Sequence, residues 1–429
     1  MPAPTGLVDD LRGASRLAID AVTGVTDLVE DLHHAVATIA PLVGAAPAGR
    51  GRGVSGLVYR GIRGVTRVVG GGVDASLAGV AALVGPDEGP SPRREAVRAA
   101  VNGVLGDTLE AEGNPLAITM QLRHGGTALP LRRAALARTF PGVDRLAVFV
   151  HGLSMNDLQW TREGHDHGLA LQRDLGFAPV QVLYNSGRRI DANGADLAAL
   201  LERLAAAWPV PLRRLVLVGH SMGGLVARSA CHHASLGDLD WLRRLDSLAC
   251  LGSPHHGAPL EQAGSRVDAF LGISPYLSPF ARLGRIRSAG VQDLRHGHVV
   301  ADDDGARHEG DDGRGTRRGV RHPPLLAPPA HVRCFLVAGT RQKLPGGRRE
   351  ALPGDGLVPV ASALALHRDP ARALRLPTTH RFIAHGSHHF DLLSSQTVYA
   401  RLQAWLADAG DASTAAGRSL DRPLSPGSA

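Results

Sequence analysis

The chain has 429 residues, of which 44% are hydrophobic, 20% are charged and only 4% are aromatic. This is the balance of a globular protein with a mainly aliphatic core, and the length allows one large domain with additions. The formal net charge is +7, but its arginines are scattered along the chain and no RNA- or DNA-binding motif accompanies them. We therefore expect no nucleic-acid partner, although the charge is compatible with attraction to an anionic lipid surface.

The cysteines and the apolar segments indicate a location inside the cell. Cys231, Cys250 and Cys334 lie far apart, and an odd number of cysteines, two of them in apolar runs, is typical of buried free thiols. The first residues lack the basic and apolar regions of a secretory signal, and no segment has the ~20 apolar residues of a membrane-spanning helix. We expect a cytoplasmic protein, with peripheral attachment to a membrane as an open alternative.

Composition separates an N-terminal amphipathic helical region, residues 1–112, from the rest of the chain. Within it Arg60, Arg63 and Arg67 recur on one helical face. Such a face is typical of a helix that lies on a lipid surface, and also of a helical pair packed on protein, so both interpretations stay open. The other expected boundaries are 113–410 for an α/β domain, about 258–300 for a cap inside it, 301–330 for a polar insertion and 411–429 for a disordered tail.

From residue 113 onward, segments with the pattern of strands alternate with segments that have helical spacing. This alternation predicts a mainly parallel sheet that is covered by helices on both faces, with an antiparallel hairpin at one edge. The hairpin is expected within 115–132; further strands are expected at 145–152, 178–185, 214–219, 247–252, 332–339 and 380–385, and helices at 167–175, 199–208, 222–234 and 392–407.

A G-x-S-x-G pentapeptide lies where one predicted strand meets a helix. Gly219-His220-Ser221-Met222-Gly223 follows Arg-Leu-Val-Leu-Val and precedes a helical segment. That strand–turn–helix order is what a nucleophile elbow requires, in which the serine hydroxyl is raised above the edge of the sheet. The pentapeptide is a weak signal alone, but in this setting it makes Ser221 the candidate nucleophile. His220 and Met222 are expected to line the site without reacting.

A serine hydroxyl needs a base to take its proton, and the base needs a carboxylate to orient it. The expected chain order is serine, acid, histidine. Asp355 lies between two glycines in the loop after the 332–339 strand, and His388 and His389 follow the last strand. We favour His389 as the base, with His388 as the alternative and His385 third.

The oxyanion of the transition state needs two backbone N–H donors. One is expected from the residue after the nucleophile, Met222, and the other from Leu153 in the loop that follows the 145–152 strand.

Several ordered blocks resemble those of bacterial lipase-like α/β-hydrolases, including triacylglycerol lipases and GPI-inositol-deacylase-like hydrolases. The resemblance covers about residues 114–407 and implies an α/β-hydrolase fold, with Ser221 as nucleophile, Asp355 as triad acid, His389 as triad base and Leu153 in the oxyanion hole. It implies a serine carboxylic-ester hydrolase with a lipid-like substrate. Residues 1–112 and the polar insertion have no counterpart in simple lipases. The blocks are His-Gly-Leu at 151–153, 184–201, 219–230, 252–261, 354–360 and 387–393.

Other chemistries receive less support from the sequence. Adjacent histidines at 33–34, 232–233 and 255–256 point in different directions on a helix or strand, so they indicate no metal site. The expected reaction needs no cofactor. An acyltransferase or thioesterase of the same fold stays open as an alternative, as does a non-catalytic membrane-surface protein that retains the fold.

Overall fold

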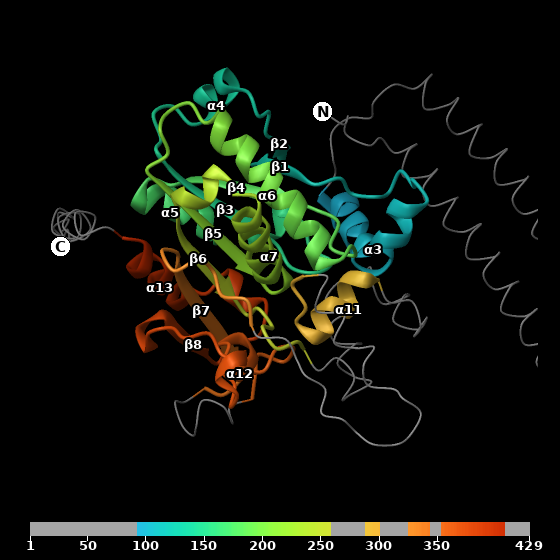
Figure 1. Ribbon diagram of the computed structural model, residues 1–429, viewed down its shortest axis with the longest axis vertical. Helices are drawn as coiled ribbons and strands as arrows, with labels where there is room; N and C mark the ends of the chain where they lie inside the picture. The colour runs from blue at the N-terminus through green and yellow to red at the C-terminus, as the bar shows by residue number, and fades with distance from the viewer. Residues whose placement is uncertain (1–91, 259–287, 301–324, 344–352, 408–429) are drawn as a thin grey trace, which may run out of the picture. The chain divides into compact units, whose positions relative to one another are not determined.

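The computed structural model describes most of the predicted α/β domain, shown in colour in Figure 1. The predictions for residues 1–91, for most of the cap and the polar insertion, and for the tail lie outside the described residues. The described ranges are 92–258, 288–300, 325–343 and 353–407.

Contacts divide the chain into two compact units. One is Met1–Arg94 with Leu109–Ala117, and the other is Glu95–Thr108 with Ile118–Ala429. In the first unit, Asn114 Oδ1 accepts the N–H of Leu116 at 2.9 Å in a turn. The structure thus assigns residues 95–108, which the sequence analysis placed in the N-terminal region, to the unit that contains the sheet.

An eight-stranded sheet forms the centre of the second unit, with the order β2-β1-β4-β3-β5-β6-β7-β8. Strands β3 to β8 pair in parallel, whereas β1 is antiparallel to both β2 and β4. The mainly parallel sheet and the antiparallel edge hairpin are therefore confirmed. The strands are β1 (Gln121–His124), β2 (Thr127–Ala128), β3 (Arg145–Val150), β4 (Ala178–Leu183), β5 (Arg214–His220), β6 (Leu245–Leu251), β7 (Arg333–Thr340) and β8 (Arg381–His385).

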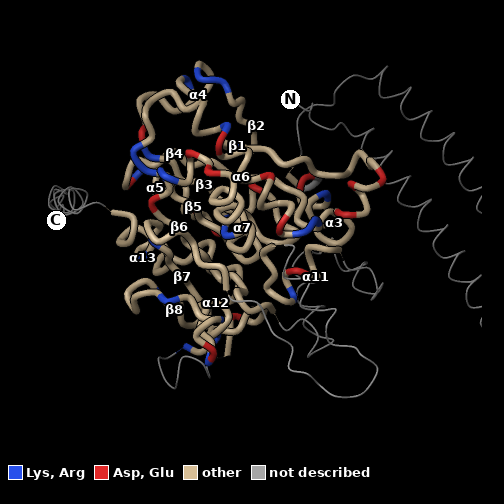
Figure 2. The backbone as a smooth tube through the Cα atoms, in the orientation of Figure 1, with Lys and Arg blue, Asp and Glu red and all other residues tan. Residues whose placement is uncertain are grey.

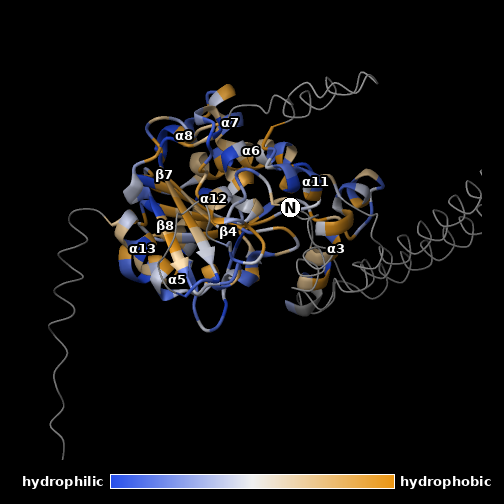
Figure 3. Ribbon diagram, turned by 90° about the horizontal axis from the view of Figure 1, so that it is seen from below, coloured by the Kyte–Doolittle hydropathy of each residue, from blue (hydrophilic) through white to orange (hydrophobic). Residues whose placement is uncertain are grey.

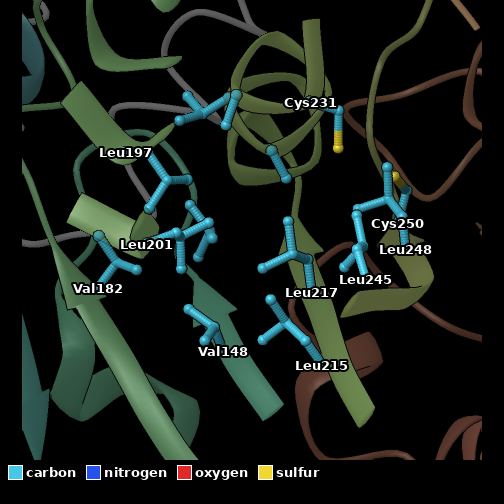
Figure 4. Packing of buried hydrophobic residues seen from close by; sticks show 14 of the residues in the cluster. Val148, Val182, Leu197, Leu201, Leu215, Leu217, Cys231, Leu245, Leu248 and Cys250 are labelled. Carbon is cyan, nitrogen blue, oxygen red and sulfur yellow. The ribbon is translucent and has the colours of Figure 1, made fainter. Parts of the chain in front are cut away.

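Alternate residues of the central strands enter two separate hydrophobic clusters. Val148, Leu215 and Leu217 belong to one cluster, and their strand neighbours Phe149 and Val216 belong to the other. Figure 4 shows the first cluster, where side chains of the sheet meet those of two helices. Since successive residues of a strand point to opposite faces, a strand covered on both faces has to be apolar throughout. This explains why these strands read as continuous apolar runs.

Each hydrophobic cluster is completed by one pair of helices. Helices α6 (Ile190–Ala207) and α7 (Met222–Leu236) pack on the first face, and α5 (His167–Leu175) and α13 (Gln396–Leu406) on the second. In Figure 3 the strand β7 is coloured hydrophobic, while helices such as α13 carry both colours, as expected of elements with one face in water. No helix within the described ranges has the length and apolar character to cross a bilayer.

Helix α3 (Pro92–Ala111) precedes the sheet. The remaining described helices are shorter: α4 (Arg133–Thr139), α8 (Asp240–Arg244), α11 (Ala289–His296), α12 (Val360–Ala363) and the 3₁₀ turns η1 (Asp157–Trp160), η4 (Pro370–Arg372), η5 (Thr378–His380) and η6 (Asp391–Leu393).

The strand order reverses its direction at β3. The chain passes from β3 to β4 on one side, and then crosses to β5 on the other side of β3. Connections that leave the carboxyl ends of β3 and β5 therefore diverge, and open α/β sheets bind ligands in the crevice that such a divergence leaves. Val150 and His220 end these two strands, so the topology points to the residues that follow them.

A buried ion pair ties the sheet edge to the segment beyond β3. Arg123 Nη1 on β1 lies 3.2 Å from Glu95 Oε2 of α3 and 3.3 Å from Asp157 Oδ1 of η1, and all three side chains are buried. Many of the other charged residues, of both signs, lie toward the outside of the coloured tube in Figure 2. Burial raises the pKa of Asp157, against the nearby Arg123, which lowers it.

Replacing Arg123 should destabilise the fold strongly. Arg123→Met leaves two buried carboxylates without their cation, so we expect the free energy of unfolding in urea to fall by about 3–5 kcal/mol. Arg243→Met is the matched control, because Arg243 pairs with Asp238 and Asp240 while all three side chains are exposed; its cost should stay within about 1 kcal/mol. Equal losses in the two variants would show that the buried pair has no special weight.

Candidate functional site

Ser221 occupies a strained turn between β5 and α7. Its backbone has φ 54° and ψ −123°, a conformation that residues with a side chain rarely adopt and that clusters at functional sites. The two flanking glycines are required by close contact: a Cβ on Gly223 would lie 2.0 Å from the Val150 oxygen, and one on Gly219 would lie 2.4 Å from the Gly224 nitrogen. The predicted strand–turn–helix elbow is thus present, and Ser221 is at its apex.

The backbone around Ser221 is held by the neighbouring strand. The N–H of Ser221 donates to the Leu251 oxygen at 2.8 Å, at the end of β6. The next residue, Met222, begins helix α7, and the first N–H groups of a helix have no partner inside it. The positive end of the helix dipole therefore faces the region of the Ser221 side chain.

His389 and Asp355, from the loops after β8 and β7, are joined by a hydrogen bond. His389 Nδ1 lies 2.7 Å from Asp355 Oδ2, and each residue is 2% exposed. The other carboxylate oxygen accepts the N–H groups of Leu357 and Val358 at 2.9 and 2.8 Å. Because the carboxylate only accepts, it fixes the proton of a neutral His389 on Nδ1 and leaves a lone pair on Nε2.

The ring of His389 lies beside the segment that holds Ser221. A Cβ on Gly252 would lie 3.1 Å from His389 Cε1, and Gly252 directly follows Leu251, the residue that accepts the Ser221 N–H. His389 Nε2 is buried and has no hydrogen-bond partner in the described part of the chain, the Ser221 hydroxyl included. Without substrate, such hydrogen bonds are often long or poorly aligned. The arrangement leaves a buried, unpaired proton acceptor next to the elbow.

The other two candidate bases have different surroundings. His388 is exposed, and its backbone N–H donates to Asp391 Oδ2 at 2.8 Å. His385 Nδ1 lies 3.3 Å from the Gln342 oxygen. The hydrogen bond to Asp355 belongs to His389 alone among these three histidines.

The turn after β3 passes against the elbow. A Cβ on Gly152 would lie 3.1 Å from the Ser221 Cβ, so the peptide that joins Gly152 to Leu153 lies beside the Ser221 side chain. His151 Nδ1 contacts the Gly152 oxygen at 2.8 Å, and the Tyr184 hydroxyl donates to the His151 oxygen at 2.8 Å. The contact to the Gly152 oxygen fixes the orientation of the peptide whose N–H belongs to Leu153, and the Tyr184 hydroxyl holds the peptide before it.

His220 has a contact that its position in the sequence did not reveal. Its Nε2 lies 3.1 Å from the backbone oxygen of His389. From the sequence alone His220 is expected only to line the site, because a bond to a backbone oxygen 169 positions away leaves no trace in residue types. Burial, with His389 close by, lowers the pKa of His220 well below its usual value.

Paired histidines elsewhere make separate contacts. His233 Nε2 lies 2.8 Å from Asp191 Oδ1, and His255 Nδ1 lies 3.0 Å from Arg228 Nη1. No group of three or more potential ligands that could hold a metal ion is found in the described ranges.

Acid should destabilise the fold through its buried neutral histidines. Burial lowers the pKa of His151 to about 4 from its usual 6.5, so the contribution of the neutral ring to stability is complete above pH 6.5 and is lost as the pH falls toward 4. Between pH 7.5 and 4.5 the wild type should lose roughly 2–3 kcal/mol more unfolding free energy than His151→Asn. Urea unfolding at the two pH values measures this difference, and parallel losses would contradict it.

Comparison with known proteins gives one family and several structures. Residues 199–307, which include Ser221 and α7, match the family described as PGAP1-like alpha/beta domain. None of the curated proteins matches the chain. Similar solved structures include a mature lipase of Bacillus licheniformis, with 20% identity and a TM-score of 0.40, covering 62% of this chain and 94% of the lipase.

Two further structures show the same range of similarity. An esterase of Pyrococcus furiosus has 14% identity and a TM-score of 0.36, covering 62% of this chain and 81% of the esterase. The type II thioesterase from the yersiniabactin pathway has 18% identity and a TM-score of 0.36, covering 62% of this chain and 92% of its own.

The sheet order, the elbow and the family match agree with one another. The chain has an α/β-hydrolase fold, residues 199–307 are similar to a PGAP1-like alpha/beta domain, and the chain is similar to lipase-like and GPI-inositol-deacylase-like hydrolases.

Proposed function

We propose that the protein is a serine carboxylic-ester hydrolase in which Ser221 is the nucleophile, His389 the general base and Asp355 the acid that orients it. The observation that carries the proposal is the buried 2.7 Å bond between His389 and Asp355, combined with an unpaired His389 Nε2 beside a strained serine. A carboxylate, an imidazole and a hydroxyl in this order are the parts of an acyl-transfer triad.

In the first stage, the Ser221 Oγ attacks the ester carbonyl carbon while His389 Nε2 takes the hydroxyl proton. The imidazolium that forms is stabilised by the Asp355 carboxylate, whose other oxygen accepts two backbone N–H groups. The tetrahedral intermediate then collapses, the carbon–oxygen bond to the alcohol breaks, and His389 gives its proton to the leaving oxygen.

In the second stage, water attacks the acyl-enzyme while His389 Nε2 takes one proton from it. Collapse of the second tetrahedral intermediate returns the proton to Ser221 and releases the carboxylic acid. In both stages the backbone N–H groups of Met222 and Leu153 are the proposed donors to the oxyanion. Each such donor typically contributes about 10²–10³ in rate, and no step requires a cofactor.

We propose lipid-like esters as the substrate class. The ordered blocks that resemble lipases and the PGAP1-like match over residues 199–307 support this choice. Contact of residues 1–112 with a lipid surface would bring such a substrate to the site. That contact stays a prediction, since residues 1–91 lie outside the described ranges.

Removing the proposed nucleophile should abolish turnover and covalent labelling. Ser221→Ala should lower kcat for p-nitrophenyl butyrate by about 10⁶, as loss of the serine does in a serine protease. A fluorophosphonate probe should label the wild type but not this variant. Ser253→Ala is the matched control, because Ser253 is also buried, lies just after β6 and has no partner for its hydroxyl among the described residues. Equal labelling of wild type and Ser221→Ala would refute the proposal.

Asp355 should be the only carboxylate of the late loops on which catalysis depends. Asp355→Asn retains the shape but holds His389 in the wrong tautomer, so kcat should fall by roughly 10⁴. Asp391→Asn is the control: Asp391 accepts the His388 N–H, which an asparagine oxygen can also do, and kcat should change little. A larger loss of kcat in Asp391→Asn than in Asp355→Asn would show that Asp355 is not the triad acid.

A further inference from the structure

His220 contacts two of the loops that meet at the elbow. Its ring lies 4.7 Å from the ring of His389, centroid to centroid, and its Nε2 lies 3.1 Å from the His389 backbone oxygen. A Cβ on Gly152, in the turn after β3, would lie 3.2 Å from His220 Nδ1. The side chain is fully buried. His220, which directly precedes the nucleophile, is therefore in contact with His389, the proposed base.

The partner of His220 determines its protonation. A backbone oxygen can only accept, so Nε2 carries the proton and donates it. Nδ1 is buried and has no hydrogen-bond partner among the described residues. Burial, the nearby His389 and other buried histidines all disfavour a second proton, and they lower the pKa of His220 well below its usual value. The His220 ring is thus neutral and donates one hydrogen bond, from Nε2.

Neighbouring aromatic rings hold His220 in this direction. The Phe390 ring lies 5.7 Å from the His220 ring and the Trp160 ring lies 6.4 Å away, centroid to centroid. Both rings limit rotation about the side-chain bonds, so the donor has a defined aim. A fixed aim matters because a displacement of about 1 Å in a catalytic group can cost roughly 10²-fold in rate.

We propose that His220 is a positioning residue, which holds the backbone of His389 so that its Nε2 faces the Ser221 hydroxyl. This inference rests on the proposed function and deepens it. Asp355 fixes the rotation of the His389 ring from the Nδ1 side, and His220 fixes the loop from the backbone side. Because His220 stays neutral, it does so without placing a positive charge beside the imidazolium that forms on His389, which a charged neighbour would disfavour.

The test uses steady-state kinetics of the full chain with p-nitrophenyl butyrate, together with the rate of fluorophosphonate labelling. His220→Leu removes the donor, and we expect kcat and the labelling rate to fall roughly 10²-fold while KM changes little, since a buried ring does not contact substrate. His220→Gln places an amide N–H at about the reach of Nε2 and should recover most of the loss. His220→Asn places it too close to the backbone and should not.

Folding controls separate alignment from stability. Circular dichroism and thermal unfolding are measured for every variant, and if His220→Leu does not fold, the Gln and Asn variants decide. His124→Leu is the matched control, because His124 Nδ1 also contacts a backbone oxygen, that of Pro179 at 2.9 Å, but lies in the β1–β2 hairpin; its kcat should equal that of wild type.

Two results would overturn the inference while leaving the proposed function intact. One is a folded His220→Leu protein with wild-type kcat, and the other is equal kcat in the Gln and Asn variants, provided that the wild type hydrolyses the ester and is labelled at Ser221. A wild type that neither hydrolyses esters nor reacts with the probe would instead overturn the proposed function, and the inference with it.

Discussion

The bond between His389 and Asp355 depends on the parallel strands β3 to β8, which all end on the same side of the sheet. Asp355 follows β7, His389 follows β8 and Ser221 follows β5, so residues 34 to 168 positions apart come together only because the strands share one direction. The continuous apolar character of these strands allows them to be buried on both faces, as parallel strands generally are. Hydrophobic burial of these strands therefore brings the candidate catalytic residues together.

At this edge of the sheet, hydrogen bonds from buried neutral side chains, and not charged groups, orient the backbone around Ser221. Gly223 lets the elbow approach the end of β3, and Gly219 lets the first turn of α7 lie against β5. The neutral rings of His151 and His220 orient backbone groups around Ser221. A neutral imidazole can be buried at far lower cost than a charged one. Asp355 supplies the carboxylate that faces the proposed base. The pKa of both rings is lowered by the same burial that excludes water from the site.

The sequence was informative wherever local pattern and local structure coincide. Helix α5 was predicted with the bounds that the structure has, because Asp166 caps its first N–H groups and Gly176 ends it in a left-handed conformation. Helix α6 begins nine residues before the predicted start at 199. Its first N–H is accepted by Asp293, on a segment more than a hundred positions away, and no local pattern records such a cap.

The same distinction applies to the candidate site. Ser221 could be selected from its pentapeptide and the elements around it, whereas His388 and His389 are adjacent and equivalent as residue types. Only the fold distinguishes them, since one is exposed and the other is buried against Asp355. The bond of His220 to a backbone oxygen and the buried pair of Arg123 with Asp157 were likewise invisible. Both link segments whose proximity is set by the sheet and not by sequence spacing.

The central claim is that an acyl group passes through the hydroxyl at the elbow. The most direct measurement is mass spectrometry of protein quenched in acid within the first turnover of an activated ester, followed by proteolysis and fragmentation. The account predicts an added acyl mass on the peptide that contains Ser221, located on that residue. An acyl group on another residue, or steady hydrolysis with no covalent intermediate under conditions where deacylation is slowed, would contradict it.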